Sequence, residues 1–144
     1  MLFLVPLIGV LVTIAIVDAR THTIPDMLWI VVALLGIARV IAGQLTWQDA
    51  VLGAFIVSVP LFAIAYFTDG FGGGDIKLMF AAGIYLGATI VVLAFALGTV
   101  LAAFVGIVLL LARRTTRKSA IAFGPYLAIG IAVMATLDTF ALIL

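Results

Sequence analysis

The sequence is poor in the side chains that commonly serve catalysis. It has no cysteine, which excludes disulfides, thiol nucleophiles and cysteine-ligated zinc. Its single histidine, His22, does not suffice for a zinc site of the usual kind. Charged residues make up only 9% of the chain, and the net charge of +1 offers no basic surface to nucleic acid. We therefore expect chemistry that needs no metal ion and no cofactor.

Apolar residues dominate what remains. They account for 67% of the 144 residues, more than a soluble domain of this length can bury. The few charges lie between long apolar runs, and a helix of about 20 apolar residues spans a bilayer core of about 30 Å. The sequence therefore predicts an all-α polytopic membrane protein. A single transmembrane domain over residues 1–144, without a separate soluble domain, is expected.

The apolar runs indicate about six transmembrane helices. The first run has no basic residue before it and no small-residue cleavage pattern after it, which predicts a retained helix. The stretch 76–112 would be roughly 55 Å long as one helix, too long for one span. Gly83 and Gly87 offer a break that divides it into a short and a full helix. The runs are 2–17, 27–42, 51–67, 76–112 in two parts, and 121–144.

Charge placement predicts the topology. A basic loop precedes the last run, and the positive-inside rule places it in the cytoplasm. Six helices then put both chain ends on the outer face. The loops after the first and third helices would be cytoplasmic, and they are expected to hold Asp18 with Arg20 and Asp75 with Lys77. The residues of the basic loop are Arg113, Arg114, Arg117 and Lys118.

Asp18 and Asp75 are the candidate catalytic residues. Two carboxyl groups a few ångströms apart cannot both ionise cheaply, so they share one proton. The ionised member can take a proton from water, while the protonated member hydrogen-bonds a scissile carbonyl and later protonates the leaving amine. Gly72, Gly73 and Gly74 precede Asp75 and leave room for the backbone of another chain. An aspartyl dyad on the cytoplasmic face is therefore predicted.

The other acids have structural explanations. Asp26 suits the first turn of a helix, where a negative charge favours the positive end of the dipole. Thr46 and Asp49 have the spacing of a capping box. Asp138 belongs near the outer end of the last helix, on the wrong face for the dyad. Asp69 competes with Asp75 because both lie in the same predicted loop.

The sequence leaves the roles of His22 and Lys77 open and suggests a structural role for one group of small residues. His22 is either a solvated loop residue or a contact for substrate. Lys77 could tune Asp75, hold a substrate carbonyl or anchor the chain in the cytoplasm. Gly98, Ala102 and Gly106 recur every fourth residue, the pattern of close helix packing, and are interpreted as structural.

Three segments resemble the type IV prepilin leader peptidases, in the order of that family. Residues 72–78, GGGDIKL, match the GxGDxKL motif of the family. Asp18 followed by Ile24-Pro25 resembles its first aspartate segment, and residues 123–128, FGPYLA, resemble its C-terminal FGP segment. The resemblance covers essentially the whole chain. Asp26 departs from it, because the family commonly has Asn there.

The resemblance implies an aspartyl endopeptidase of the inner (plasma) membrane. Such enzymes remove the short basic leader of prepilin-like membrane proteins on the cytoplasmic side. Asp18 and Asp75 correspond to the catalytic pair of the family. The residues implied to bind substrate or shape the site are Gly72, Gly73, Gly74, Lys77, Pro25, Gly124 and Pro125.

The resemblance is to a short form of the family. Longer members carry an N-terminal cytoplasmic segment with paired cysteines and also methylate the new N-terminus. This chain shows neither that segment nor any cysteine and resembles the peptidase-only form found with Flp/Tad-type pili. N-methyltransferase activity is therefore not expected.

Other function classes stay open. A presenilin-like intramembrane protease also uses a GxGD aspartate but cuts within the transmembrane helix of its substrate. A small ion- or proton-coupled transporter or channel subunit would use intramembrane aspartates to carry charge. An inert assembly subunit of a secretion machine would need neither. The bilayer is an expected partner in every case, and a homo-oligomer is left open.

Overall fold

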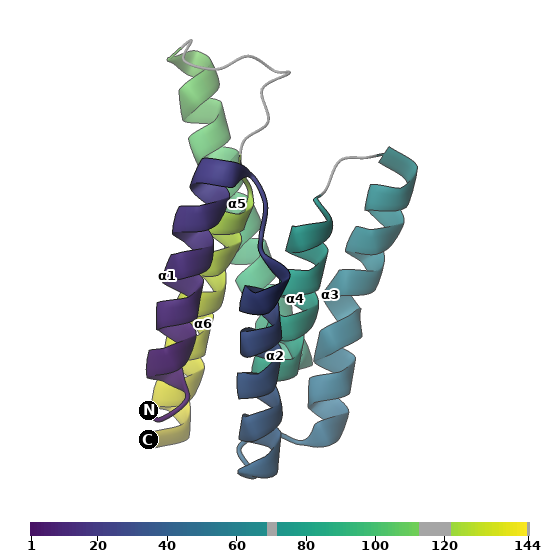
Figure 1. Cartoon of the computed structure of the whole chain (residues 1–144), viewed down its shortest axis with the longest axis vertical. Coiled ribbons are helices and arrows are strands. Elements are labelled where there is room, and N and C mark those ends of the chain that lie inside the picture. The colour runs from purple at the N-terminus through teal and green to yellow at the C-terminus, as the bar shows by residue number, and fades with distance from the viewer. Residues whose placement is uncertain (69–71, 113–121, 144) are drawn as a thin grey trace.

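Helices account for all the regular structure in the part of the chain that is described. The structure, a computed structural model, describes residues 1–68, 72–112 and 122–143. Both termini lie at the same end of the bundle (Figure 1). The predicted all-α class is confirmed. The helices are α1 (Leu4–Thr21), α2 (Asp26–Ile41), α3 (Trp47–Thr68), α4 (Gly73–Leu86), α5 (Ala88–Leu111) and α6 (Gly124–Ile143).

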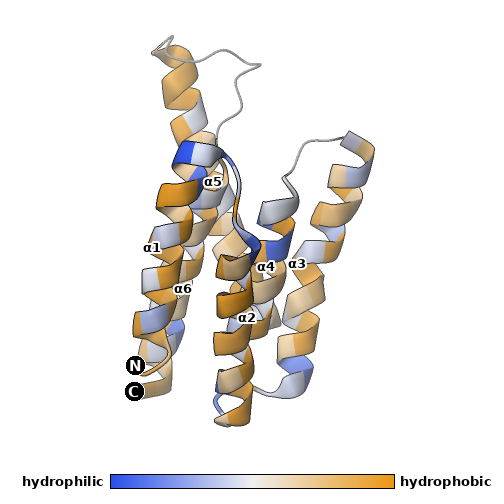
Figure 2. Cartoon of the chain, viewed as in Figure 1, coloured by the Kyte–Doolittle hydropathy of each residue, from blue (hydrophilic) through white to orange (hydrophobic). Residues whose placement is uncertain are grey.

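The helices differ in length in a way that matters for the site. α1, α3, α5 and α6 are each long and apolar enough to cross a membrane. α2 has 16 residues and α4 has 14, so they are roughly 24 and 21 Å long. Apolar residues cover the helices along most of their length, with polar residues towards the ends (Figure 2). The chain is a multi-pass membrane protein in which α4 starts well short of the level that α3 reaches (Figure 1).

The helices pack in two groups. α4 packs most extensively against α3 and α2, whereas α6 packs most extensively against α5 and α1. α5 also contacts α3 and α4, but the contacts of α1 with α2 and of α4 with α6 are few. α4 is the most enclosed helix, and Leu78, Met79, Ala81 and Ala82 on it have no exposed surface. The α2–α3–α4 group and the α1–α5–α6 group are therefore each centred on one helix, α4 or α6, and α5 joins the two groups through its contacts with α3 and α4.

Glycines allow the helices to approach closely. A Cβ atom on Gly83 of α4 would overlap the carbonyl group of Gly53 on α3, and the converse also holds. On α2, a Cβ atom on Gly36 would lie 2.7 Å from the backbone nitrogen of Tyr85. Gly98 of α5 packs against the backbone of α6, which confirms its predicted packing role.

The predicted break in the long apolar stretch is confirmed. α4 ends at Leu86, and α5 begins at Ala88 after Gly87, whose φ of 79° suits glycine. The Asp49 carboxylate accepts a hydrogen bond from the N–H of Ala88 at 3.1 Å. The N–H of Asp49 also donates to Thr46 Oγ1, which is the forward half of the predicted capping box. Asp49 therefore caps α5 as well as completing the start of α3.

Two of the predicted loops are helical where the structure describes them. α1 continues to Thr21, so Asp18 and Arg20 lie in its last turn and not in a loop after it. α4 begins at Gly73, which places Asp75 in its first turn. Polar residues extend both helices because the backbone hydrogen bonds continue past the apolar runs. The predictions for Asp69 and for the basic loop at 113–118 lie outside the described residues.

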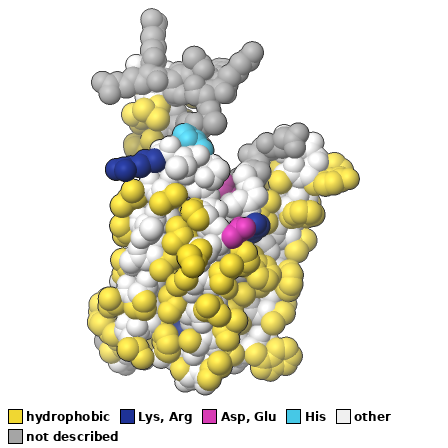
Figure 3. All heavy atoms as spheres, in the orientation of Figure 1, with side chains coloured by type: hydrophobic (Ala, Val, Ile, Leu, Met, Phe, Trp, Pro, Cys, Tyr) yellow, Lys and Arg dark blue, Asp and Glu magenta, His cyan; other side chains and the backbone are white. Residues whose placement is uncertain are grey.

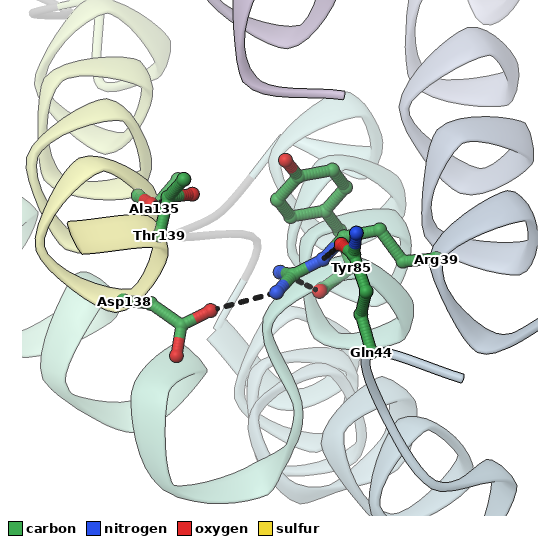
Figure 4. Close-up of polar contacts among 6 residues, drawn as sticks. All are labelled: Arg39, Gln44, Tyr85, Ala135, Asp138 and Thr139. Atoms are coloured by element: carbon green, nitrogen blue, oxygen red, sulfur yellow. Dashed lines mark hydrogen bonds and ion pairs between the residues drawn. The ribbon is translucent and has the colours of Figure 1, made fainter. Parts of the chain in front are cut away.

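The structure contains a buried ion pair, at the end of the bundle away from Asp18, that the sequence did not predict. Arg39 on α2 is only 2% exposed and donates from Nη2 to Asp138 on α6 at 2.9 Å. Its Nη1 donates to the carbonyl oxygen of Tyr85 at 2.9 Å, and its Nε donates to Gln44 at 3.3 Å (Figure 4). The guanidinium also lies over the ring of Tyr85. This cluster joins the α2–α3–α4 group to the α1–α5–α6 group.

Replacing Gly83 with alanine is expected to lower the free energy of unfolding by about 1–3 kcal/mol, because the methyl group meets backbone and cannot be accommodated by a rotamer change. Gly9→Ala is the matched control, since nothing lies within 4 Å of a Cβ atom at Gly9. Unfolding in mixed detergent micelles, followed by circular dichroism, measures both. Equal stability of the two variants would contradict the close contact of α3 with α4.

Replacing Asp138 with asparagine is expected to destabilise the protein by about 3–5 kcal/mol, because it leaves the buried Arg39 charge uncompensated. The double variant Arg39→Met/Asp138→Leu removes both charges and should be much closer to the wild type in the same unfolding assay. A double variant as unstable as the single one would show that packing, and not charge, is the main contribution of this pair.

Candidate active site

Asp18 is held between α1 and α6. Its side chain is 5% exposed, and Oδ2 accepts a hydrogen bond from the N–H of Gly124 at 3.0 Å. Gly124 is the first residue of α6, so the carboxyl group lies at the positive end of that helix dipole. A Cβ atom on Gly124 would lie 2.5 Å from Oδ2, so a larger residue there would displace the Asp18 carboxyl group. Pro125 follows in the first turn, where a missing N–H is tolerated.

Asp75 lies in the first turn of α4 and is partly buried. Its N–H donates to the carbonyl oxygen of Gly72 at 3.1 Å, which starts the helix. The carboxyl groups of Asp18 and Asp75 interact electrostatically across the interface between the two helix groups. The two acids that the sequence singled out are thus near each other, with Asp18 in the α1–α5–α6 group and Asp75 in the α2–α3–α4 group.

The glycines before Asp75 have two different surroundings. Gly72 and Gly73 are exposed, and nothing lies within 4 Å of a Cβ atom on Gly73. A Cβ atom on Gly74, by contrast, would lie 3.0 Å from Cβ of Ile24. Gly74 is therefore tightly packed against Ile24, whereas Gly72 and Gly73 leave open backbone beside the Asp75 carboxyl group.

Lys77 binds to α2. Its Nζ donates to Oδ1 of Asp26 at 2.7 Å, and the same oxygen accepts a hydrogen bond from Nε1 of Trp29 at 2.9 Å. Asp26 is the first residue of α2, as predicted, and Pro25 is the residue that precedes the helix. The sequence did not predict this ion pair of Lys77 with Asp26.

The remaining acids in the described part of the chain lie elsewhere. Asp49 at the start of α3 and Asp138 near the end of α6 are at the opposite end of the bundle from Asp18 (Figure 1). His22 is exposed beside α1, with a left-handed φ of 53°. Residues 1–68, 72–112 and 122–143 contain no group of three potential metal ligands from His, Cys, Asp and Glu.

The site lies at an open end of the bundle. The space-filling view shows a hollow between the α1–α2 connection and the end of α3, with acidic side chains in it and at its rim (Figure 3). The last turns of α3 expose large apolar side chains on the other side of this hollow, among them Phe62, Tyr66 and Phe67. Gly72 and Gly73 are exposed at this open end.

The sequence did not predict two of the contacts at the site. The hydrogen bond from Gly124 to Asp18 joins residues 106 positions apart, and neither apolar periodicity nor charge pattern indicates such a pair. The Asp26–Lys77 ion pair had a weak signal, because both residues fall in the first two turns of neighbouring helices at the same end.

The fold and the two carboxyl groups define a polytopic membrane protein with an aspartate pair at one end of its helices. The model of the type IV leader peptidase family matches residues 5–107, which include Asp18 and Asp75. The chain belongs to the type IV leader peptidase family. No solved structure matches the chain.

Curated relatives carry the name prepilin leader peptidase/N-methyltransferase. The protein of that name from Aeromonas hydrophila is 32% identical, over 83% of this chain and 44% of its own length. Those from Pseudomonas putida and Bacillus subtilis are also 32% identical, over 89% and 85% of this chain and 47% and 50% of their own lengths. The chain thus spans about half the length of the curated relatives it matches.

Replacing Gly124 with alanine is expected to lower the free energy of unfolding by about 1–3 kcal/mol, because the new methyl group displaces the buried Asp18 carboxyl group. The same change in an Asp18→Ala background should cost clearly less, since the clash is then removed. Unfolding of the four proteins in a double-mutant cycle measures the coupling. If Gly124→Ala lowered the free energy of unfolding equally in both backgrounds, the contact of Gly124 with Asp18 would be contradicted. Gly73→Ala, at an open position, is the matched control.

Proposed function

We propose that this chain is a membrane aspartyl endopeptidase of the GxGD type that removes the basic leader of prepilin-like proteins. The main support is that Asp18 and Asp75 lie within electrostatic range of each other, that open glycine backbone lies beside Asp75, and that the chain belongs to a family of leader peptidases. The relatives' names also state an N-methyltransferase activity, which is said of those proteins. For this chain we propose the peptidase activity alone.

The geometry supports a division of roles between the two acids. Asp18 already accepts a hydrogen bond from Gly124 through one oxygen, which suits it to be the ionised member that takes a proton from water. Asp75, next to the exposed backbone of Gly72 and Gly73, is placed to donate its proton to the carbonyl oxygen of the scissile bond. Two carboxyl groups that repel each other when both are ionised favour the state in which one of them is protonated.

The reaction then proceeds without further groups. As Asp18 takes a proton from water, the hydroxide oxygen bonds to the carbonyl carbon and Asp75 passes its proton to the carbonyl oxygen. When the tetrahedral intermediate collapses, the C–N bond breaks and the proton held by Asp18 goes to the leaving nitrogen. The hydroxyl proton of the intermediate returns to Asp75, so both acids end as they began.

The substrate is proposed to lie with its apolar helix in the bilayer beside the enzyme. Its basic leader would extend over the cytoplasmic face, attracted by the single negative charge that Asp18 and Asp75 carry between them when they share one proton. The cleavage site would lie at the junction, against Gly72 and Gly73. The enzyme would thus act at the cytoplasmic side of the inner membrane.

Asp75→Asn and Asp18→Asn are each expected to reduce cleavage by at least about 10²–10⁴-fold, because each removes a proton-transfer group. The measurement is co-expression with a prepilin-like substrate, followed by gel shift and N-terminal sequencing of the product. Asp49→Asn is the matched control, since an asparagine can still accept the hydrogen bond from Ala88.

Each alternative predicts a different result. A cut inside the apolar segment would indicate a presenilin-like protease. Ion flux in liposomes without any cleavage would indicate a transporter. Substantial cleavage by Asp18→Asn would exclude the dyad.

A further inference from the structure

The α1–α2 connection joins the two acids of the site physically. It starts at His22, whose N–H donates to the carbonyl oxygen of Asp18 at 2.8 Å. Two residues later, Ile24 is only 8% exposed and packs against Gly74, the residue before Asp75. The connection then enters α2 at Asp26. A short segment therefore reaches from the backbone of one acid to the neighbour of the other.

The end of this connection is anchored on α4 by charge. Asp26 Oδ1 accepts hydrogen bonds from Lys77 Nζ at 2.7 Å and from Trp29 Nε1 at 2.9 Å, and Lys77 Nζ lies 5.8 Å from the centre of the Trp29 ring. Lys77 follows Asp75 by two residues, so the anchor holds the same turns of α4 that carry the catalytic acid. Ile24 and Asp26 thus bind the start of α4 at two neighbouring points.

Stability alone does not account for this anchor. The side chains of Asp26 and Lys77 are 65% and 49% exposed, and ion pairs of that exposure contribute little to stability. The location of the pair is more informative than its strength, because α1 has few contacts with α2, and α4 has few contacts with α6. The connection is therefore a covalent link between the two helix groups at the end that holds Asp18 and Asp75, in addition to the contacts of α5 with α3 and α4.

We propose that Asp26 and Lys77 form a positioning pair that, with Ile24 on Gly74, sets the separation between the carboxyl groups of Asp18 and Asp75. The inference rests on the proposed function, since separation matters because the two acids share the work of proton transfer. Neither Asp26 nor Lys77 touches the reacting atoms. Both act through the position of Asp75.

The test exchanges the two charges. Asp26→Lys and Lys77→Asp should each lower kcat about tenfold with little change in KM, because small misplacement of a reacting group slows the chemical step. The double variant Asp26→Lys/Lys77→Asp restores the pair in reverse and should recover kcat to within about threefold of the wild type. Asp26→Asn keeps an oxygen that accepts from Lys77 and should lose less than Asp26→Lys. Arg20→Gln, at an exposed charge on the end of α1, is the matched control.

Direct recognition of a basic leader by Asp26 predicts a different pattern. Asp26→Lys would then raise KM, whereas Lys77→Asp would lower it, because the two changes have opposite effects on a cationic substrate. Opposite shifts in KM, with kcat unchanged in both single variants, would overturn the positioning role. Loss in both single variants without recovery in the double variant would also overturn it.

A second measurement does not depend on cleavage. Because the chain has no cysteine, spin labels can be placed at Ala19→Cys and Gly73→Cys, both at exposed positions next to the two acids. Pulsed electron–electron double resonance should give a narrow distribution of distances between the two labels in the otherwise wild-type chain. Asp26→Lys or Lys77→Asp should broaden or shift this distribution, and the double variant that exchanges the charges should make it narrow again.

The two measurements separate the possible failures. Absence of cleavage by the wild type, with the distances changing as expected, would refute the proposed function and leave the positioning of the two segments supported. Normal cleavage together with unchanged distances in both single variants would refute the positioning pair and leave the proposed function intact.

Discussion

The backbone contact of α3 with α4 is the constraint on which the rest of the structure depends. Gly53 and Gly83 leave no room for a Cβ atom, so α4 lies directly against its neighbour along a stripe without side chains. Gly36 on α2 makes a similarly close contact with the backbone of α4 at Ile84 and Tyr85. Because the lipid provides no hydrophobic force between helices, such close packing is what holds α4 in place. The short α4, carrying Asp75 in its first turn, is thereby enclosed by longer or flanking helices.

Much of this fold could be predicted from the sequence because apolar length is a strong signal in a membrane protein. The runs indicated six helices, and the topology argument favoured a break in 76–112 at the position where Gly87 lies between α4 and α5. Helix ends were less predictable. α1 includes Asp18, and α4 includes Asp75, because backbone hydrogen bonds continue into polar residues that a hydropathy pattern assigns to loops.

The site was predictable in its acids and less so in their partners. Asp18 and Asp75 stood out as charges next to apolar runs, and Gly72–Gly74 stood out as consecutive glycines. The donor to Asp18 comes from Gly124, which is distant in sequence and offers only a backbone N–H. Arg39 and Asp138 were equally hidden, because an ion pair between helices leaves no periodic trace in a single sequence. Long-range polar contacts of this kind depend on how the helices pack.

The Arg39–Asp138 pair makes the two ends of the bundle different, because it links α2 to α6 at one end only. It joins the two helix groups at the end opposite the acids, where Gly87 also connects α4 to α5. Asp75 lies roughly 15 Å along α4 from Tyr85, which the Arg39 cluster holds through its carbonyl oxygen. A tilt of about four degrees about Tyr85 would move the Asp75 carboxyl group by about 1 Å, a displacement that can change a rate about 10²-fold. The separation of the two carboxyl groups is therefore sensitive to the tilt of α4, because the Arg39 cluster holds this helix at the end that is remote from them.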